Sequence, residues 1–449
     1  MTLHQFIAEL NSIIWGPATL VLLVGTGVYL TWRLQLIQLL RLPMALGLLF
    51  KPAQGKGDLS PFAALCTALS ATIGTGNIVG VATAIKIGGP GALFWMWLAA
   101  FFGMATKYAE CLLAVKFRTT DKHGRIAGGP MYYIEKGLGL GWLAKLFAMF
   151  GVGVAFFGIG TFAQVNAITD AMHIAFHIPT WVTAIALTVL VAAVVLGGVS
   201  RIAAVAQKLV PAMAIGYLLA CLWILGLNHS NILPAIELVL HSAFNPTAAA
   251  GGFLGATVAM ALQIGIARGV FSNESGLGSA PIAAAAAKTN EPAEQGLVSM
   301  TGTFFDTIIV CTMTGLVLII TGVWNGDAAG AAMTSAAFAT GGNALIGQYL
   351  VTIALVCFAF TTILGWNYYG ERCWTYLTAD RGSRVYQLIF LSLIAMGAFI
   401  KLDLIWMLAD CVNGLMAIPN LIAIIGLRQV IVSETQGYFA RLRLAGVPA

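Results

Sequence analysis

Residues 268–278 read Arg-Gly-Val-Phe-Ser-Asn-Glu-Ser-Gly-Leu-Gly and interrupt an otherwise apolar segment, residues 250–287. As one straight helix this segment would be about 57 Å long at about 1.5 Å per residue, whereas the hydrocarbon core of a bilayer is about 30 Å thick. A polar, glycine-rich stretch at membrane depth is expected to unwind, and it must then line a cavity or be buried in protein. The segment therefore predicts a broken membrane helix.

The composition places the rest of the chain in a membrane as well. The 449 residues are 59% hydrophobic and 9% charged, whereas a soluble domain is about 25% charged. So few charges could not cover a surface that faces water, and we therefore expect an all-α integral membrane protein. About eleven segments are long and apolar enough to be spans of about 20 residues: roughly residues 11–32, 60–85, 92–115, 146–170, 180–198, 206–227, 250–287, 297–322, 344–368, 384–400 and 403–427.

The basic residues predict how these spans are oriented. With the N-terminus outside, all but three of the 23 Lys and Arg residues lie in or beside the loops of one side. The exceptions are Lys86, Arg268 and Lys401. Because cytoplasmic loops are enriched in Lys and Arg, this side is predicted to be the cytoplasm. An odd number of spans then places the C-terminus in the cytoplasm.

A second interrupted segment lies five spans earlier in the chain. The apolar segment 60–85 contains Gly74-Thr75-Gly76-Asn77. If the first span is set aside, the two interrupted segments become spans one and six of ten, as in transporters built from two five-span halves of inverted topology. The predicted units are an N-terminal span and cytoplasmic loop (1–59), a first five-helix repeat (60–240), a second five-helix repeat (241–430) and a cytoplasmic C-terminal tail (431–449).

Broken helices expose binding groups at the centre of a bilayer. Each unsatisfied backbone N–H or C=O there costs on the order of several kcal/mol, and a bound solute can satisfy it. The N-terminus of a half-helix suits a carboxylate, whereas C-terminal ends and freed carbonyls suit Na⁺. A zwitterionic amino acid together with a small cation fits this arrangement. The alternative is that the glycines only allow close helix packing.

Three stretches of the sequence resemble one known family. They are Ser70–Gly80 (Ser-Ala-Thr-Ile-Gly-Thr-Gly-Asn-Ile-Val-Gly), Ala127–Ile134 (Ala-Gly-Gly-Pro-Met-Tyr-Tyr-Ile) and Gly269–Pro281, of which the last looks like the family signature. Over nearly its whole length the chain resembles the alanine or glycine:cation symporters, also called sodium:alanine symporters, of the amino acid–polyamine–organocation superfamily. The resemblance implies a leucine-transporter-type 5+5 inverted-repeat core with two broken helices, preceded by one extra span. It also implies uptake of alanine, glycine or both coupled to Na⁺, with H⁺ coupling in some members, across a bacterial cytoplasmic (inner) membrane.

The residues at the two breaks are the first candidates for binding the substrate. Thr75 and Asn77 offer side-chain hydrogen bonds, and Gly76 exposes its backbone to a carboxylate. Asn77 could instead only cap the second half-helix. At the second break, Asn273 could bond the substrate or a cation, and Phe271 could close over a small side chain.

The fourth and ninth spans add three more substrate candidates. Phe157, Thr161 and Gln164 are expected to share one helix face, and the resemblance favours Gln164 as the acceptor for a substrate ammonium over an interhelical hydrogen bond. In the ninth span, Thr362 and Trp366 are assigned to the substrate, with the bulky Trp366 limiting substrate size. The alternative for Trp366 is packing in the core.

Cation binding is assigned to Thr361 together with the backbone carbonyls of Thr72 and Gly74. Hydroxyl and carbonyl oxygens suit Na⁺. The resemblance also implies that the helix formed by the ninth span completes a cation site with the first broken helix.

Three charged residues are expected at membrane depth, where charges are rare and usually paired. Arg268 and Glu274 either form a mutual ion pair that holds the unwound loop, or Glu274 takes part directly in proton or cation coupling. Asp306 lies roughly 14 Å into the eighth span at 1.5 Å per residue. It either contributes to a cation site or is a hydrogen-bonded structural acid.

The expected partners are alanine or glycine, a co-transported Na⁺ and membrane lipid, with no organic cofactor and no nucleic acid. Nothing in the sequence demands more than a monomer. An enzyme is not expected, because the HExxH and GxSxG motifs are absent from the sequence. The alternative functions are the same fold coupled to H⁺, or the same fold carrying another amino acid or a nucleobase. A channel fits less well, because channels usually build pores from symmetric subunits or repeated filter loops.

Overall fold

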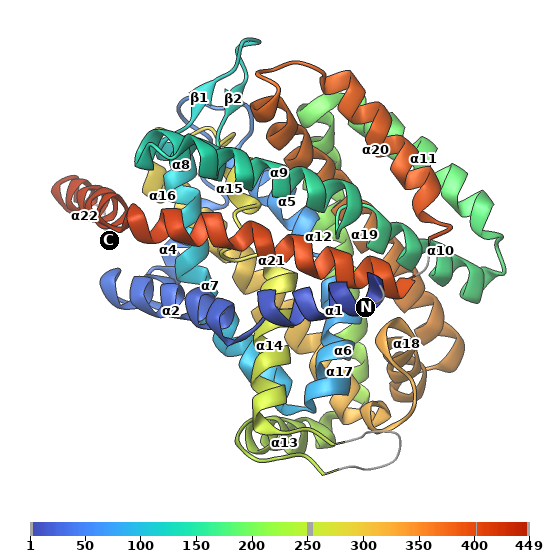
Figure 1. The fold of residues 1–449 in the computed structure, drawn as a ribbon. Helices are drawn as coiled ribbons and strands as arrows, with labels where there is room; N and C mark the ends of the chain where they lie inside the picture. Colours follow the sequence, from blue (N-terminus) through green and yellow to red (C-terminus); the bar gives the residue numbers. More distant parts are fainter. Residues whose placement is uncertain (1–2, 249–254, 401, 447–449) are drawn as a thin grey trace.

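The chain folds almost entirely into helices (Figure 1). The structure, a computed structural model, describes residues 3–248, 255–400 and 402–446. The α-helices are α1 (Leu3–Ile14), α2 (Pro17–Arg33), α3 (Ile37–Leu40), α4 (Leu42–Leu48), α5 (Pro61–Thr72), α6 (Val81–Gly88), α7 (Gly91–Lys116), α8 (Pro130–Leu138), α9 (Gly141–Phe157), α10 (Phe162–Phe176), α11 (Thr180–Val195), α12 (Gly198–Leu227), α13 (Ile232–Phe244), α14 (Val258–Asn273), α15 (Ala280–Ala284), α16 (Pro292–Thr303), α17 (Thr312–Ile320), α18 (Gly330–Gly341), α19 (Ala344–Leu377), α20 (Ser383–Gly397), α21 (Leu402–Gly426) and α22 (Arg428–Leu444).

Shorter elements connect or interrupt these helices. Two π-helical turns, η1 (Gly76–Gly80) and η3 (Phe304–Cys311), lie within longer helical segments, and the 3₁₀ turns are η2 (His229–Asn231) and η4 (Val323–Asn325). An antiparallel hairpin of β1 (Thr119–Thr120) and β2 (Ile126–Ala127) joins α7 to α8. Because π-turns inside helices are frequent at functional sites, η1 and η3 draw attention to the residues they carry.

The helices support a multi-pass membrane protein. Within the described chain, seven helical segments are long and apolar enough to cross a bilayer, and α5 with η1 and α6 would form an eighth span that bends by 53°. The other three expected segments correspond to the shorter helices α11, α14 and α20. Figure 1 shows α11 and α20 side by side at the edge of the molecule, where they pack against each other. The count of eleven spans remains a prediction.

One expected helix face does not exist as predicted. The segment 141–176 is helical, but it breaks after Phe157 and resumes at Phe162, so Phe157, Thr161 and Gln164 do not lie on one continuous helix. The break follows from Gly158 and Gly160. A Cβ at Gly160 would lie 2.8 Å from the Cα of Ala155, and glycine is a poor helix former.

The long helix α7 holds the centre of the fold. It packs against both α14 and α16. The contact with α14 is close, because a Cβ at Gly265 would overlap the carbonyl oxygen of Ala92. Small residues of this kind let helix backbones approach one another in a membrane. The α14 segment that precedes the second break is therefore fixed against the core.

The segment predicted as a C-terminal tail is helical over most of its length. Helix α22 follows α21 directly and buries one face, which includes Ile431, Thr435 and Phe439. The hydroxyls of Thr435 and Tyr108 on α7 are 2.8 Å apart. Figure 1 shows α22 extending from the end of α21 at one side of the molecule. The end of the chain is thus docked on the membrane bundle.

Candidate functional site

The first broken helix is interrupted where the sequence predicts it. Helix α5 begins with the Ser60 hydroxyl accepting a hydrogen bond from the N–H of Ala63 at 3.1 Å, which is an N-cap. The helix ends at Thr72, and helical structure resumes as η1 after a bend of 53°. The N–H of Gly74 donates to the Asn77 side-chain oxygen at 2.9 Å. Asn77 therefore bridges the break and satisfies one of the freed backbone groups.

The second break lies later than expected. Residues 268–273 remain in α14, and the chain leaves the helix only at Glu274, before α15 begins at Ala280. Glu274, Gly276 and Gly278 have positive φ angles of 56°, 87° and 85°, a conformation that glycine adopts at little cost. The Asn273 side-chain oxygen accepts a hydrogen bond from the N–H of Ser275 at 2.9 Å. The packing of α14 against α7 explains why its last turn stays helical.

The two breaks meet in space. A Cβ added to Gly76 would lie 3.2 Å from the Cα of Ser272, closer than most side chains tolerate. The first break thus contacts the last turn of α14 directly, and glycine at position 76 makes this approach possible.

A buried carboxylate joins the two broken helices. Asp306, in η3, accepts hydrogen bonds from the Asn77 amide at 2.8 Å, the Ser272 hydroxyl at 2.9 Å and the Thr307 hydroxyl at 2.7 Å. The amide of Asn273 in turn donates to Thr307 at 3.0 Å. All of these side chains are buried. Of the two roles left open for Asp306, the hydrogen-bonded acid is the one that these contacts describe.

No group of three or more Asp, Glu, His or Cys side chains in the described part of the chain is arranged to hold a metal ion. The oxygens that meet at the two breaks are mostly neutral, apart from the carboxylate of Asp306. Such oxygen-rich surroundings at broken helices are typical of Na⁺ sites in secondary transporters.

Gln164 reaches the first break from α10. Its side-chain amide donates to the Thr75 hydroxyl at 3.1 Å. The amide oxygen is buried and has no hydrogen-bond partner among the described residues. Because an unsatisfied buried acceptor costs about 1–3 kcal/mol, this oxygen is suited to accept a hydrogen bond from a bound ammonium group.

Helix α19 places its two threonines differently. A Cβ at Gly74 would overlap the hydroxyl oxygen of Thr362, so Thr362 lies directly beside the first break. The hydroxyl of Thr361 donates to the carbonyl of Phe358 at 3.0 Å and lies 3.6 Å from the sulfur of Met213 on α12. Both threonines are fully buried.

The ion pair proposed between Arg268 and Glu274 is wrong. The Glu274 carboxylate accepts hydrogen bonds from the indole N–H of Trp366 at 3.0 Å and from the Ser279 hydroxyl at 2.5 Å. Arg268 instead forms a two-pronged ion pair with Asp410 on α21, at 3.1 and 2.8 Å. Arg268 and Glu274 are six residues apart in sequence and lie on either side of the end of α14. Each therefore contacts a different partner.

A cavity of about 300 Å³ lies beside the Arg268–Asp410 pair. Phe271 and Arg268 both line it, and the Arg268 guanidinium lies over the Phe271 ring at 5.3 Å. Trp15, between α1 and α2, donates from its indole N–H to the Asp410 carbonyl at 3.0 Å. The extra N-terminal segment thus supports the wall of a cavity that leads toward the second break.

A second buried ion pair was not anticipated. Lys107 and Glu110, one helical turn apart on α7, lie 3.7 Å apart and are almost completely buried. The amide of Asn420 on α21 donates to Glu110 at 2.8 Å and to the carbonyl of Gly276 at 2.9 Å. This links the loop of the second break to both helices. Opposite charges three residues apart inside an apolar run are a sequence signal for such a pair.

The predicted site residues therefore converge. The two breaks, Gln164, Thr362 and Trp366 surround one region from α5–η1, α10, α14 and α19. A solute could enter only after helices or loops move, because the side chains assigned to the substrate are at most 2% exposed: Thr75, Asn77, Gln164, Phe271, Asn273, Thr362 and Trp366. This is the closed arrangement expected of a transporter between its open states.

Comparison with known proteins identifies the family of the chain. The sodium:alanine symporter family model matches residues 1–447. This chain belongs to the sodium:alanine symporter family. Among relatives, the sodium/alanine symporter AgcS of Methanococcus maripaludis is 52% identical over 98% of each chain. An uncharacterized transporter of Haemophilus influenzae is 63% identical over 99% of this chain and 98% of its own.

A solved structure supports the fold expected for this symporter family member. MhsT, in its crystal structure in complex with L-phenylalanine, superposes with a TM-score of 0.58 at 13% identity, covering 87% of this chain and 99% of MhsT. The fold is thus leucine-transporter-like. At this level of identity the likeness concerns the fold alone.

Proposed function

We propose that this member of the sodium:alanine symporter family takes up alanine, glycine or both, driven by Na⁺, by alternating access. The observation that carries the proposal is the contact of the two breaks, at Gly76 and Ser272, around the buried carboxylate of Asp306. Freed backbone groups, neutral oxygens and one carboxylate meet there, out of contact with solvent. These are the groups that a zwitterion and a small cation require.

The substrate is assigned to the space between the breaks. Its carboxylate would meet the backbone around Gly76 and the side chains of Thr75 and Asn77, and its ammonium would meet the unpaired oxygen of Gln164. Phe271, Asn273, Thr362 and Trp366 would enclose the remainder. A ring as large as Trp366 beside such a compact region favours a small side chain.

The cation is assigned to Thr361 with the carbonyls of Thr72 and Gly74. Thr362 lies nearest Gly74, whereas the Thr361 hydroxyl contacts the Phe358 carbonyl and the Met213 sulfur, so Thr361 would have to turn toward the break to bind the cation. Asp306 and Glu274 are the carboxylates available to a second cation or to a proton. Arg268 is a structural charge paired with Asp410.

The chain is proposed to consist of two five-helix repeats, residues 60–240 and 241–430, behind an N-terminal unit of residues 1–59 and ahead of a tail of residues 431–449. The distribution of Lys and Arg favours an external N-terminus and a cytoplasmic C-terminus in a bacterial inner membrane. We propose that a monomer suffices for transport.

Uptake of labelled alanine by proteoliposomes tests the function. The purified full-length protein is reconstituted, and either an inward Na⁺ gradient or a pH gradient is imposed, with excess unlabelled glycine, D-alanine or leucine. Accumulation driven by Na⁺ and blocked by glycine but not by leucine is expected. Accumulation driven only by the pH gradient would mean that H⁺, and not Na⁺, is the coupling ion. No accumulation of alanine or glycine under either gradient would overturn the substrate assignment.

A further inference from the structure

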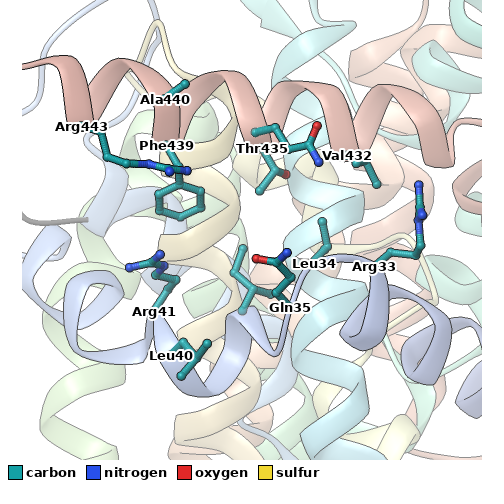
Figure 2. Close-up of a pocket in the computed structure, with 12 residues that line it drawn as sticks. Arg33, Leu34, Gln35, Leu40, Arg41, Val432, Thr435, Phe439, Ala440 and Arg443 are labelled. Carbon is teal, nitrogen blue, oxygen red and sulfur yellow. The ribbon is translucent and has the colours of Figure 1, made fainter.

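A second cavity, which shares no lining residue with the breaks, lies between helix α22 and the segment that joins α2 to α4. It has a volume of about 410 Å³, and Figure 2 shows the side chains that surround it. Arg33 ends α2, and Arg41 lies between α3 and α4, while Arg443 comes from the last turn of α22. Because α2 closes a candidate span at Arg33, the cavity lies at the level where the chain leaves the hydrocarbon core.

The cavity carries an excess of positive charge. None of its lining residues is acidic, and Arg33, Arg41 and Arg443 form no ion pair with an acidic side chain in the described part of the chain. Arg41 lies over the ring of Phe439 at 4.6 Å. In Figure 2, Arg41 and Arg443 lie toward one end of the cavity and Arg33 toward the other.

Two other charged residues of α22, which do not line the cavity, form ion pairs. Glu434 and Arg441, both on α22, are paired with Lys116 and Glu291, each at 2.6 Å. These two charges of α22 are therefore paired with other elements, whereas Arg428, at the start of the helix, donates to the carbonyl of Ile425 at 3.0 Å. The three arginines that line the cavity remain available to an anion from outside the chain.

Apolar side chains border this charged cavity. Trp32, Leu36 and Leu40 are 72%, 43% and 60% exposed. A neighbouring cavity of about 490 Å³ shares Arg33 with the 410 Å³ cavity and extends to Trp32 and Leu36. A soluble anion would need the arginines but not this apolar border, whereas a lipid would use both.

We propose that this cavity binds the phosphate headgroup of an anionic phospholipid, with the acyl chains lying along Trp32, Leu36 and Leu40. Arginines bind phosphate through strong, charge-assisted hydrogen bonds, and basic pockets at the ends of membrane helices are suited to anionic headgroups. The side-chain amides of Gln35 and Gln436, and the Thr435 hydroxyl nearby, add neutral polar groups to the same lining.

Such a lipid would connect the two ends of the chain. Its headgroup would lie between the extra N-terminal span and α22, and α22 is itself held to α7 through Thr435 and Tyr108. Occupancy should therefore stabilise the docked position of α22.

Lipid-dependent thermal stability of the purified full-length protein tests the proposal. The test variant is the triple substitution Arg33→Gln, Arg41→Gln, Arg443→Gln. The control is Lys145→Gln, Lys208→Gln, Arg384→Gln, which removes the same charge from exposed positions on other helices. Melting temperatures are measured in detergent with added phosphatidylglycerol, phosphatidylcholine, glycerol phosphate or inorganic phosphate.

Phosphatidylglycerol is expected to raise the melting temperature of the parent and of the control variant. In the triple variant, this shift in melting temperature is expected to be at most half as large. Phosphatidylcholine and the two soluble phosphates are expected to have little effect. An equal shift with phosphatidylcholine, or an undiminished shift in the triple variant, would overturn the proposal. A full shift with inorganic phosphate would assign the cavity to a soluble anion instead. If the triple variant does not fold, the same comparison is made with single variants. Native mass spectrometry then measures how much phosphatidylglycerol is retained by the test variant Arg443→Gln and by the control variant Arg384→Gln.

Discussion

The side-chain amide of Asn77 donates a 2.8 Å hydrogen bond to the carboxylate of Asp306, 229 residues further along the chain. Asn77 also holds the backbone of Gly74, and Asp306 also accepts from Ser272. One buried carboxylate therefore depends on the geometry of both broken helices. A cation that binds at this carboxylate would favour the arrangement in which the two breaks are together, which is a direct way to couple ion binding to closure.

Asp306→Asn is expected to weaken the response to Na⁺. The substitution keeps the size of the side chain but removes the charge. Hydrogen bonds to a charged group are worth about 1.5–3 kcal/mol. A loss of this size corresponds to about tenfold or more in affinity. The Na⁺ concentration that gives half-maximal alanine uptake should rise by about that factor. Asp327→Asn, at an exposed acid, is the control. An unchanged Na⁺ dependence in Asp306→Asn would leave this carboxylate with a structural role only.

Gly76→Ala is expected to slow transport. The new methyl group would lie 3.2 Å from the Cα of Ser272, and overpacking of this kind costs about 1–3 kcal/mol, so uptake should fall by roughly tenfold. Gly80→Ala, in the same π-turn, is the matched control, because a Cβ there meets nothing within 4 Å. Initial rates for the two variants at equal amounts of folded protein make the comparison. Equal activity of both would show that the breaks do not need this contact.

The two breaks could be predicted because their signal is local. Glycine and polar residues at membrane depth cannot stay in a lipid-facing helix, and this holds whatever the rest of the chain does. The exact end of α14 could not be predicted in the same way. Its last turn, from Arg268 to Asn273, stays helical because it packs against α7, and the sequence of the turn itself does not contain that information.

The partners of the charged residues could not be predicted from local pattern. Arg268 and Asp410 are 142 residues apart, and only the folded arrangement of α14 and α21 brings them together. Glu274, which is nearer to Arg268 in sequence, points to Trp366 instead. The Lys107–Glu110 pair is different, because its spacing on one helix is visible in the sequence and the mere presence of both charges in an apolar run indicates a buried pair.

The valine variants of the two adjacent threonines should separate cation from substrate. Thr361→Val removes a hydroxyl assigned to Na⁺, so it should raise the Na⁺ requirement about tenfold while alanine affinity at saturating Na⁺ changes little. Thr362→Val should weaken alanine binding. Uptake measured over a matrix of Na⁺ and alanine concentrations distinguishes the two effects. If Thr362→Val alone changes the Na⁺ requirement, the cation lies at the contact between Thr362 and Gly74 rather than at Thr361.

The Arg268–Asp410 pair should show strong thermodynamic coupling. The side chains are 19% and 9% exposed, and removing one partner of a largely buried pair leaves an uncompensated charge. Arg268→Gln and Asp410→Asn should each destabilise the protein, and the double variant should be no less stable than the worse single variant. The expected interaction energy is about 0.5–3 kcal/mol.

The exposed pair Arg441–Glu291, with side chains 57% and 35% exposed, provides the control cycle. Its coupling should be about 0–1 kcal/mol. Thermal unfolding of the single and double variants in detergent measures both cycles. Additive effects at Arg268 and Asp410 would contradict a functional ion pair at the wall of the cavity.

Trp366 is expected to have two separable roles, one as a wall of the pocket and one as a hydrogen-bond donor to Glu274. Trp366→Phe keeps most of the ring but removes the N–H, which leaves one carboxylate oxygen of a buried acid without its donor and should cost about 1–3 kcal/mol of stability. Trp366→Leu also removes bulk. Leucine should therefore compete with alanine for uptake in Trp366→Leu but not in Trp366→Phe. If neither substitution changes the competition by leucine, Trp366 packs the core and does not limit the size of the substrate.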